Sequence, residues 1–252
     1  MTGVQTCALP ISAVEGRPGR ALAPQRTAPT RAPAALRTFD GIDASLGNGV
    51  PPDPNGDVGP THVVEAVNTY IGIYSKATGT LVTGTSFDSL MWAAGLHGAC
   101  GTSNQGDPYV VYDRVSDRWI VTDFAFGLDV LSRPVGPFYE CIAVSKTPSP
   151  VSGGWYAYQV LIDGTLMNDY PKFGVGADGL YMTVNLFGSL GFAGVEVDAF
   201  NRARLVDGTL DDTGASNQFQ RDMSGSAYSL LPANDESASQ ASGTPEIGRA
   251  HV

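Results

Sequence analysis

An internal repeat of about sixty residues is the feature that most restricts the fold of this chain. In one copy Asp107 opens a predicted strand, a turn follows, and the next predicted strand begins at Trp119. Sixty-two residues later Asp169 opens the same arrangement, with Tyr181 in the place of Trp119. A shorter, earlier copy begins at Asp57. Repeats of this length with several short strands each are typical of propeller blades.

The repeat predicts an all-β fold. Each copy continues into a third strand, and a fourth strand fits residues 155–162. We therefore expect a β-propeller fragment of about three four-stranded blades. The composition agrees, because 31 Gly and 17 Pro among 252 residues suit short strands joined by turns and disfavour a helical bundle. The alternative is a β-sandwich whose strands resemble one another by chance.

Composition also divides the chain and excludes some functions. Residues 12–37 are rich in Ala, Pro and Arg without apolar periodicity, which predicts a disordered linker. Residues 38–245 form the predicted partial propeller domain. The formal net charge of −10 disfavours nucleic acid as a partner. No apolar run approaches the length of about eighteen residues that a transmembrane segment requires.

The two ends of the chain resemble translated sequencing adapter. Residues 2–11 match the in-frame translation of a common short-read adapter, and residues 247–252 match that of its reverse complement. We therefore expect residues 1–11 and 246–252 to be artefactual, and the remainder to be an internal fragment of a longer gene. On this interpretation the missing signal peptide carries no information.

Acidic residues recur at the start of the first strand in each copy. Asp57, Asp107 and Asp169 hold this place, and equivalent positions of neighbouring blades lie on one rim of the central funnel. Carboxylates that converge there provide oxygen ligands for a hard cation, or the acid and base of glycoside hydrolysis, for which Asp107 and Asp169 are the candidates. The alternative is that each Asp accepts backbone N–H bonds in the turn before its strand.

Four residues are predicted to contact a ligand on this rim. They are Asp57, His62, Asp123 and Asn185, of which the last two are related by the repeat. His62 begins a predicted strand, so a core position is the alternative for it. The sequence has no H-E-x-x-H, paired C-x-x-C or G-x-S-x-G motif, and therefore supports neither a zinc site nor a serine hydrolase.

The segment before the first strand has features of a calcium-binding loop. Asp53, Asn55 and Asp57 carry side-chain oxygen atoms at alternating positions, as such loops do. Calcium is therefore the candidate cofactor. The loop lacks the distal Glu of an EF-hand and contains Pro54, so a rigid loop that leads into the strand is the alternative.

Two cysteines, Cys100 and Cys141, lie outside the adapter-like ends. An even number of cysteines in an acidic, Gly-rich β protein favours a disulfide formed outside the cytoplasm. Two buried free thiols are the alternative.

Several short motifs occur in order along residues 38–210. They read P-P-D-P-N-G-D-V-G at 51–59, G-D-P at 106–108, D-R-W at 117–119 and Y-P-K-F-G-V at 170–175. In their order and spacing the chain resembles a family of large, secreted bacterial proteins of unknown function. The resemblance implies secretion, propeller-type architecture and a Cys100–Cys141 bridge, but it supplies no established catalytic residues.

A weaker similarity is to sialidase-like and arabinanase-like propeller hydrolases, whose blades often open with Asp-Pro. It implies a general base at Asp107, although the sequence has no full Asp-box. Together these features predict a secreted or cell-surface module that binds or adheres to carbohydrate or protein, with a glycan or a cell-surface protein as partner. The alternative is a glycoside hydrolase that uses Asp107 and Asp169 on the funnel rim.

Overall fold

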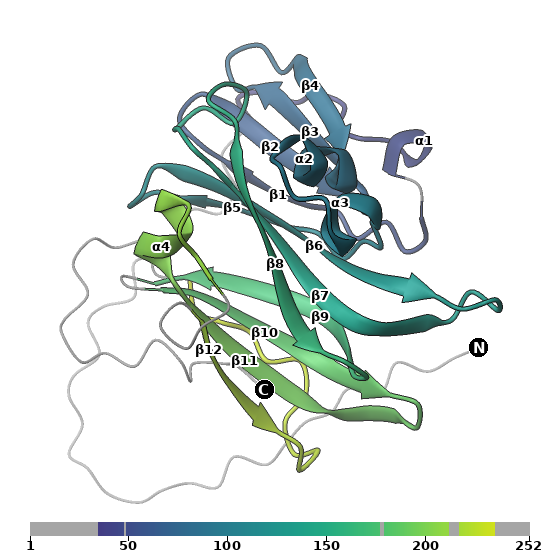
Figure 1. Cartoon of the computed structure of the whole chain (residues 1–252). Helices are drawn as coiled ribbons and strands as arrows, with labels where there is room; N and C mark the ends of the chain where they lie inside the picture. The colour runs from purple at the N-terminus through teal and green to yellow at the C-terminus, as the bar shows by residue number, and fades with distance from the viewer. Residues whose placement is uncertain (1–34, 48, 177–178, 212–216, 235–252) are drawn as a thin grey trace, which may run out of the picture. The chain divides into compact units, whose positions relative to one another are not determined.

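The residues described by the computed structural model are 35–47, 49–176, 179–211 and 217–234 (Figure 1). The chain divides into two compact units, residues 1–36 and 37–252, and every described helix and strand belongs to the second unit. Both predicted artefactual ends lie outside the described residues, as do most of the predicted linker and the last residues of the predicted domain.

The described residues form three four-stranded antiparallel sheets, and within each sheet the strands lie in chain order. The first sheet consists of β1 (Asn55–Val58), β2 (His62–Val67), β3 (Tyr70–Ser75) and β4 (Leu81–Ser86). The second consists of β5 (Tyr109–Asp113), β6 (Arg118–Leu128), β7 (Pro134–Ser145) and β8 (Trp155–Asp163). The third consists of β9 (Met167–Val175), β10 (Gly179–Gly188), β11 (Gly191–Asn201) and β12 (Asn217–Asp222). The prediction of an all-β fold with three four-stranded units is confirmed.

Helices in the described part of the chain are short. They are α1 (Ala44–Gly47), α2 (Phe87–Ala93), α3 (Ala99–Thr102) and α4 (Arg202–Asp207). None of the helices in the described ranges has the length and apolar character that crossing a membrane requires. The segment between β4 and β5 carries α2 and α3 and leads from the first sheet to the second.

The second sheet has a hydrophobic core on each of its faces. Successive side chains of a strand point to opposite faces. In β6, Trp119 and Val121 therefore join the core shared with the first sheet, whereas Ile120 joins the core shared with the third. Gly59 allows the first sheet to lie close to the second, because a Cβ at this position would lie 2.6 Å from Cζ2 of Trp119 in β6.

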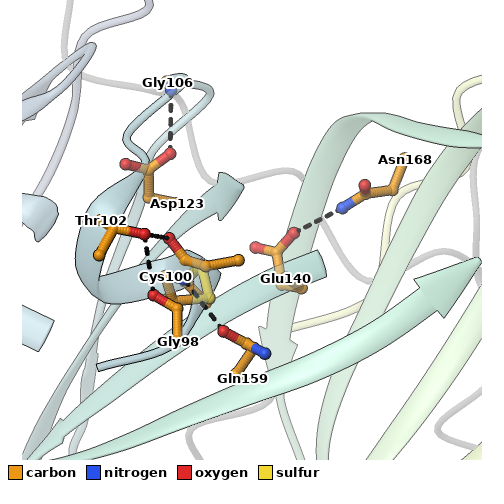
Figure 2. The surroundings of a disulfide bond; sticks show 10 residues. Gly98, Cys100, Thr102, Gly106, Asp123, Glu140, Gln159 and Asn168 are labelled. Atoms are coloured by element: carbon orange, nitrogen blue, oxygen red, sulfur yellow. Dashed lines mark hydrogen bonds between the residues drawn. A yellow bond between two sulfur atoms is a disulfide. The ribbon is translucent and has the colours of Figure 1, made fainter. Parts of the chain in front are cut away.

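The predicted disulfide is confirmed, and the alternative of two free thiols is excluded. Cys100 of α3 is bonded to Cys141 of β7, and both residues are buried. The backbone N–H of Cys100 also donates to Oε1 of Gln159 at 3.0 Å (Figure 2). The bridge therefore ties the segment between β4 and β5 to an inner strand of the second sheet.

Chain segments pack on the outer faces of the first and third sheets. On the first sheet, the N–H of Ile42 donates to Oε2 of Glu65 in β2 at 2.8 Å. On the third, the N–H of Ser229 donates to Oδ1 of Asn185 in β10 at 2.9 Å. Because the neighbours of Glu65 and Asn185 in sequence point into the two cores, these two side chains lie on the faces turned away from the second sheet.

Candidate functional site

The first strands of the three sheets contact one another in chain order: β1 lies against β5, and β5 lies against β9. Two side chains of β1 bond to the backbone of β5. Oδ1 of Asn55 accepts from the N–H of Val110 at 2.7 Å, and Oδ2 of Asp57 accepts from the N–H of Tyr112 at 2.8 Å. These bonds satisfy backbone donors at the edge of the second sheet. Asn55 and Asp57 thus join the first sheet to the second.

These bonds bear on the predicted calcium loop. One oxygen of Asn55 and one of Asp57 already bind the backbone of β5, and Oδ1 of Asp57 accepts from the N–H of Val58 at 2.7 Å. Within the described ranges, no group of three or more His, Cys, Asp and Glu side chains is arranged to hold a metal ion. The observed roles of Asn55 and Asp57 are therefore those of strand connectors.

Strand register shows which residues of the three hairpins correspond. The first two strands of each sheet contain one pair whose members are eleven residues apart in sequence, namely Asn55–Ala66, Val110–Val121 and Lys172–Thr183. Asp107 and Asp169 each lie three residues before the first member of their pair, and Asp53 lies two residues before it. Asp57 lies two residues after it. The register therefore corrects the predicted alignment of the first copy, since Asp57 does not hold the place of the other two acids. Asp53 lies one residue from that place.

The turns that contain these acids have unusual backbone conformations. The φ angle is +41° at Asp53, +49° at Asp107 and +58° at Tyr170. These values lie in the left-handed region that residues other than glycine rarely adopt. Each of the three residues directly precedes a proline. Residues held in this region cost about 1 to 3 kcal/mol each and gather at binding and catalytic sites. These three turns are therefore candidates for a functional site.

Asp107 and Asp169 form the acidic centre of these turns. Oδ2 of Asp107 accepts from the N–H of Tyr170 at 3.2 Å, so the second sheet is joined to the third by an Asp side chain, as the first is to the second. Burial, together with the charge of Asp169, raises the pKa of Asp107 to about 6. Burial also raises the pKa of Asp169, and the charge of Asp53 adds to the effect. The charge of Asp53 thus acts on both of the other acids, and that of Asp169 acts on Asp107.

A lysine that the sequence analysis missed lies among these acids. Nζ of Lys172 is 3.7 Å from the centroid of the Tyr170 ring and 5.8 Å from that of the Tyr109 ring. It donates to the carbonyl oxygen of Pro171 at 2.9 Å. Burial lowers the pKa of Lys172, and the charge of Asp107 opposes this effect. We name the following five residues the junction site: Asp53, Asp107, Asp169, Tyr170 and Lys172.

Buried polar side chains lie behind the junction site. Oδ1 of Asp123 accepts from the N–H of Gly106 at 2.9 Å and so holds the backbone next to Asp107. Nδ2 of Asn168 donates to Oε2 of Glu140 at 3.0 Å, from the third sheet to the second (Figure 2). Burial raises the pKa of both Asp123 and Glu140 well above the ordinary range, which favours their neutral forms. These two buried acids thus hold the backbone and side chains next to the junction site in place.

The other predicted rim residues lie at different distances from the junction site. His62 is the first residue of β2. The opposite end of β2 lies near Asp53, because the N–H of Asn68, just after that end, donates to the carbonyl oxygen of Pro52 at 2.9 Å. His62 is therefore separated from Asp53 by the length of the strand, about 20 Å. Asn185 pairs directly with Asp169 and flanks the site.

A groove of about 390 Å³ lies on the first sheet. Its lining includes Phe39, Pro54, Asn55, Asp57 and Glu65. The acids of the junction site do not line it. Asn55 and Asp57, two of the predicted calcium ligands, thus line a groove that is separate from the junction site. This groove is the alternative location for a bound ligand.

We expect the free energy of unfolding to fall as the pH rises above about 4.5, the ordinary pKa of a glutamic acid side chain. The pKa values of Asp123 and Glu140 are raised on folding, so the folded state retains protons that the unfolded state releases. This contribution is complete below the unfolded pKa values and is lost as the pH rises through the folded ones. Glu140→Gln, which keeps an acceptor for Asn168, should flatten the profile and stabilise the protein at alkaline pH.

Urea unfolding at several pH values measures this dependence. Asp40→Asn, at an exposed position, is the matched control for the loss of one carboxylate. A stability that increases steadily as the pH rises, or a slope that Glu140→Gln leaves unchanged, is incompatible with neutral acids behind the junction site.

Comparisons with known proteins do not identify a relative. Neither a protein-family model, nor a curated protein, nor a solved structure matches the chain. The family resemblance of its motifs stays a prediction, and the geometry described above is the basis for a functional proposal.

Proposed function

We propose that the three sheets are consecutive blades of a β-propeller and that the junction site binds carbohydrate or protein. The observation that carries this proposal is the convergence of Asp53, Asp107 and Asp169 where the three first strands meet. The innermost strands of propeller blades surround a central channel. The contacts of β1 with β5 and of β5 with β9, each of them first in its sheet, support this arrangement.

The junction site has the groups that a binding site needs. The carboxylates of Asp107 and Asp169 accept hydrogen bonds from ligand hydroxyl or amide groups, and the ammonium of Lys172 donates them. The Tyr170 side chain is 41% exposed and offers an aromatic face. Because three acids surround one lysine, the site disfavours anionic ligands.

The proposal places the protein outside the cytoplasm, secreted or at the cell surface. The Cys100–Cys141 disulfide supports this location, since such bonds persist in oxidising compartments. A cell-surface glycan or a cell-surface protein is the proposed partner. Membership of the secreted family that the sequence motifs resemble belongs to the same proposal.

Thermal unfolding with a panel of glycans and peptides tests the function. A ligand that binds the folded state at one hundred times its Kd stabilises it by about 2.7 kcal/mol, so at least one member should raise the Tm of the wild-type protein. Asp107→Asn combined with Asp169→Asn should abolish the shift, whereas Asp40→Asn should retain it. A shift that survives the double replacement places binding elsewhere, and a panel without any shift rejects the proposed function.

The electrostatics of the junction site favour a second candidate, a glycoside hydrolase. A carboxyl group whose pKa is raised to about 6, as in Asp107, suits general acid or base catalysis near neutral pH, and Asp169 is its carboxylate partner. Under this alternative Asp107→Asn should lower kcat on an arabinan or sialoside substrate by about 100-fold or more, with little change in Kd. Binding without any turnover by the wild-type protein favours the binding module.

A further inference from the structure

We propose that the junction site binds an uncharged sugar through two adjacent hydroxyl groups, which Lys172 and the carboxylates of Asp107 and Asp169 hold between them. This inference rests on the proposed function. It adds the class of ligand and names Lys172 as the residue that selects it.

Lys172 uses only part of its hydrogen-bonding capacity within the described chain. An ammonium group has three N–H donors, and one of them bonds to the carbonyl oxygen of Pro171. The charges of Asp107, Asp53 and Asp169, with that of Asp107 the strongest, act on Lys172. In the described part of the chain, no carboxylate oxygen lies within 4.0 Å of Nζ of Lys172 to form an ion pair. The ammonium and the acids are thus near each other without being paired.

A hydroxyl group fits between partners arranged in this way, because it accepts one hydrogen bond while donating another. One sugar hydroxyl accepts from Nζ of Lys172 and donates to a carboxylate, and its neighbour on the ring does the same at the second acid. A carboxylate ligand would meet three acids, so the charges of the site disfavour anions. An ammonium group cannot accept the hydrogen bond that Lys172 offers, because it has no acceptor. A hydroxyl group, which both accepts and donates, therefore suits the site best.

The surroundings of Lys172 support a sugar ring in particular. Tyr170 is part exposed, and its backbone N–H is bonded to Asp107, which fixes the backbone of Tyr170 relative to the acid. Nζ of Lys172 lies over one face of the ring, so the opposite face is the one that would pack against the apolar face of a sugar ring. Next to Asp107, Oδ2 of Asp123 has no hydrogen-bond partner among the described residues although Asp123 is only 2% exposed. A buried polar atom of this kind calls for a water or ligand group nearby.

Two matched sets of monosaccharides test the class of ligand. The first is galactose, galacturonic acid and galactosamine, and the second is glucose, glucuronic acid and glucosamine. Ligand-observed NMR with the full chain should give binding by a neutral member of at least one set, and binding at least five-fold weaker by its charged counterparts. Lys172→Met should weaken binding of that neutral sugar at least ten-fold, whereas Lys172→Arg, which keeps the donors, should retain more of it.

Lys146→Met is the matched control, since Lys146 also lies over a tyrosine ring, with Nζ 4.9 Å from the centroid of Tyr156, and it should bind like the wild type. Tighter binding of an acidic or amino sugar overturns the inference but leaves the proposed function standing. Unchanged binding by Lys172→Met overturns it as well. If no sugar of either set binds, the inference fails, and the peptide members of the thermal panel decide the proposed function separately.

Discussion

Replacing both Cys100 and Cys141 by alanine is expected to lower the free energy of unfolding by about 3 to 4 kcal/mol. The bridge spans 41 residues, and a closed loop of this length restricts the unfolded chain substantially. Both residues are buried in the core between the first and second sheets, so the variant also loses packing. Urea unfolding under non-reducing conditions measures the change.

The same replacement should weaken ligand binding at the junction site. The bridged segment runs from α3 into Gly106 and Asp107. Without the bridge it is attached to the second sheet by hydrogen bonds, which include those of Cys100 to Gln159 and of Gly106 to Asp123. Wild-type protein unfolded in the presence of dithiothreitol is the control and should match the double variant. A loss of stability below about 1 kcal/mol would show that the bridge is not a structural restraint.

Arg221→Met is expected to destabilise the protein by about 3 kcal/mol. Arg221 in β12 forms an ion pair with the buried Glu196 of β11. It also bonds to Oδ2 of Asp163 at 2.7 Å and to the carbonyl oxygen of Ile162 at 2.7 Å, both in β8. One side chain therefore connects the third sheet to the second, and its loss leaves an acid buried without its partner.

A second replacement separates the charge of Arg221 from its packing. Burial and the charge of Glu196 raise the pKa of Asp198 well above the ordinary range, so Glu196 is the charged member that needs the guanidinium. Arg221→Met combined with Glu196→Gln should recover most of the loss in a double-mutant cycle. Equal stability of Arg221→Met and the wild type would contradict this role.

The all-β architecture was predictable because it depends on local features. Alternating and β-branched runs, with Gly and Pro between them, specify short strands wherever they occur. The 62-residue offset is also real in the structure, since Val110 and Lys172 hold the same place in their hairpins. The disulfide was predictable because residues 12–245 contain two cysteines, an even number, and the structure joins them.

The composition of the junction site was less accessible to sequence. The first copy was aligned on Asp57, at a spacing of 50 residues from Asp107, whereas its hairpin corresponds to the second at a spacing of 55. The sequence alignment matched residues of the same type, whereas the structure aligns the hairpins by strand register. Lys172 was missed although it lies in a motif, Y-P-K at 170–172, because nothing in sequence places its side chain beside acids of another sheet.

The prolines offer a sequence signal for these turns. Asp53, Asp107 and Tyr170 each stand before a proline. A search for residues that precede proline at the start of each copy therefore locates the three turns, to within one residue of the strand register, without reference to the acids. The long-range bonds of Asn55 and Asp57 to β5 had no such signal, because they depend on how neighbouring sheets pack.

We propose that ligand binds where the first strands of the three sheets meet. Backbone amide NMR of the wild-type protein, titrated with whichever panel member raises the Tm, tests it most directly. We expect the largest chemical-shift changes at Gly106, Asp107, Tyr170 and Lys172. Changes centred instead on Gly41 and Glu65, in the groove of the first sheet, would contradict it.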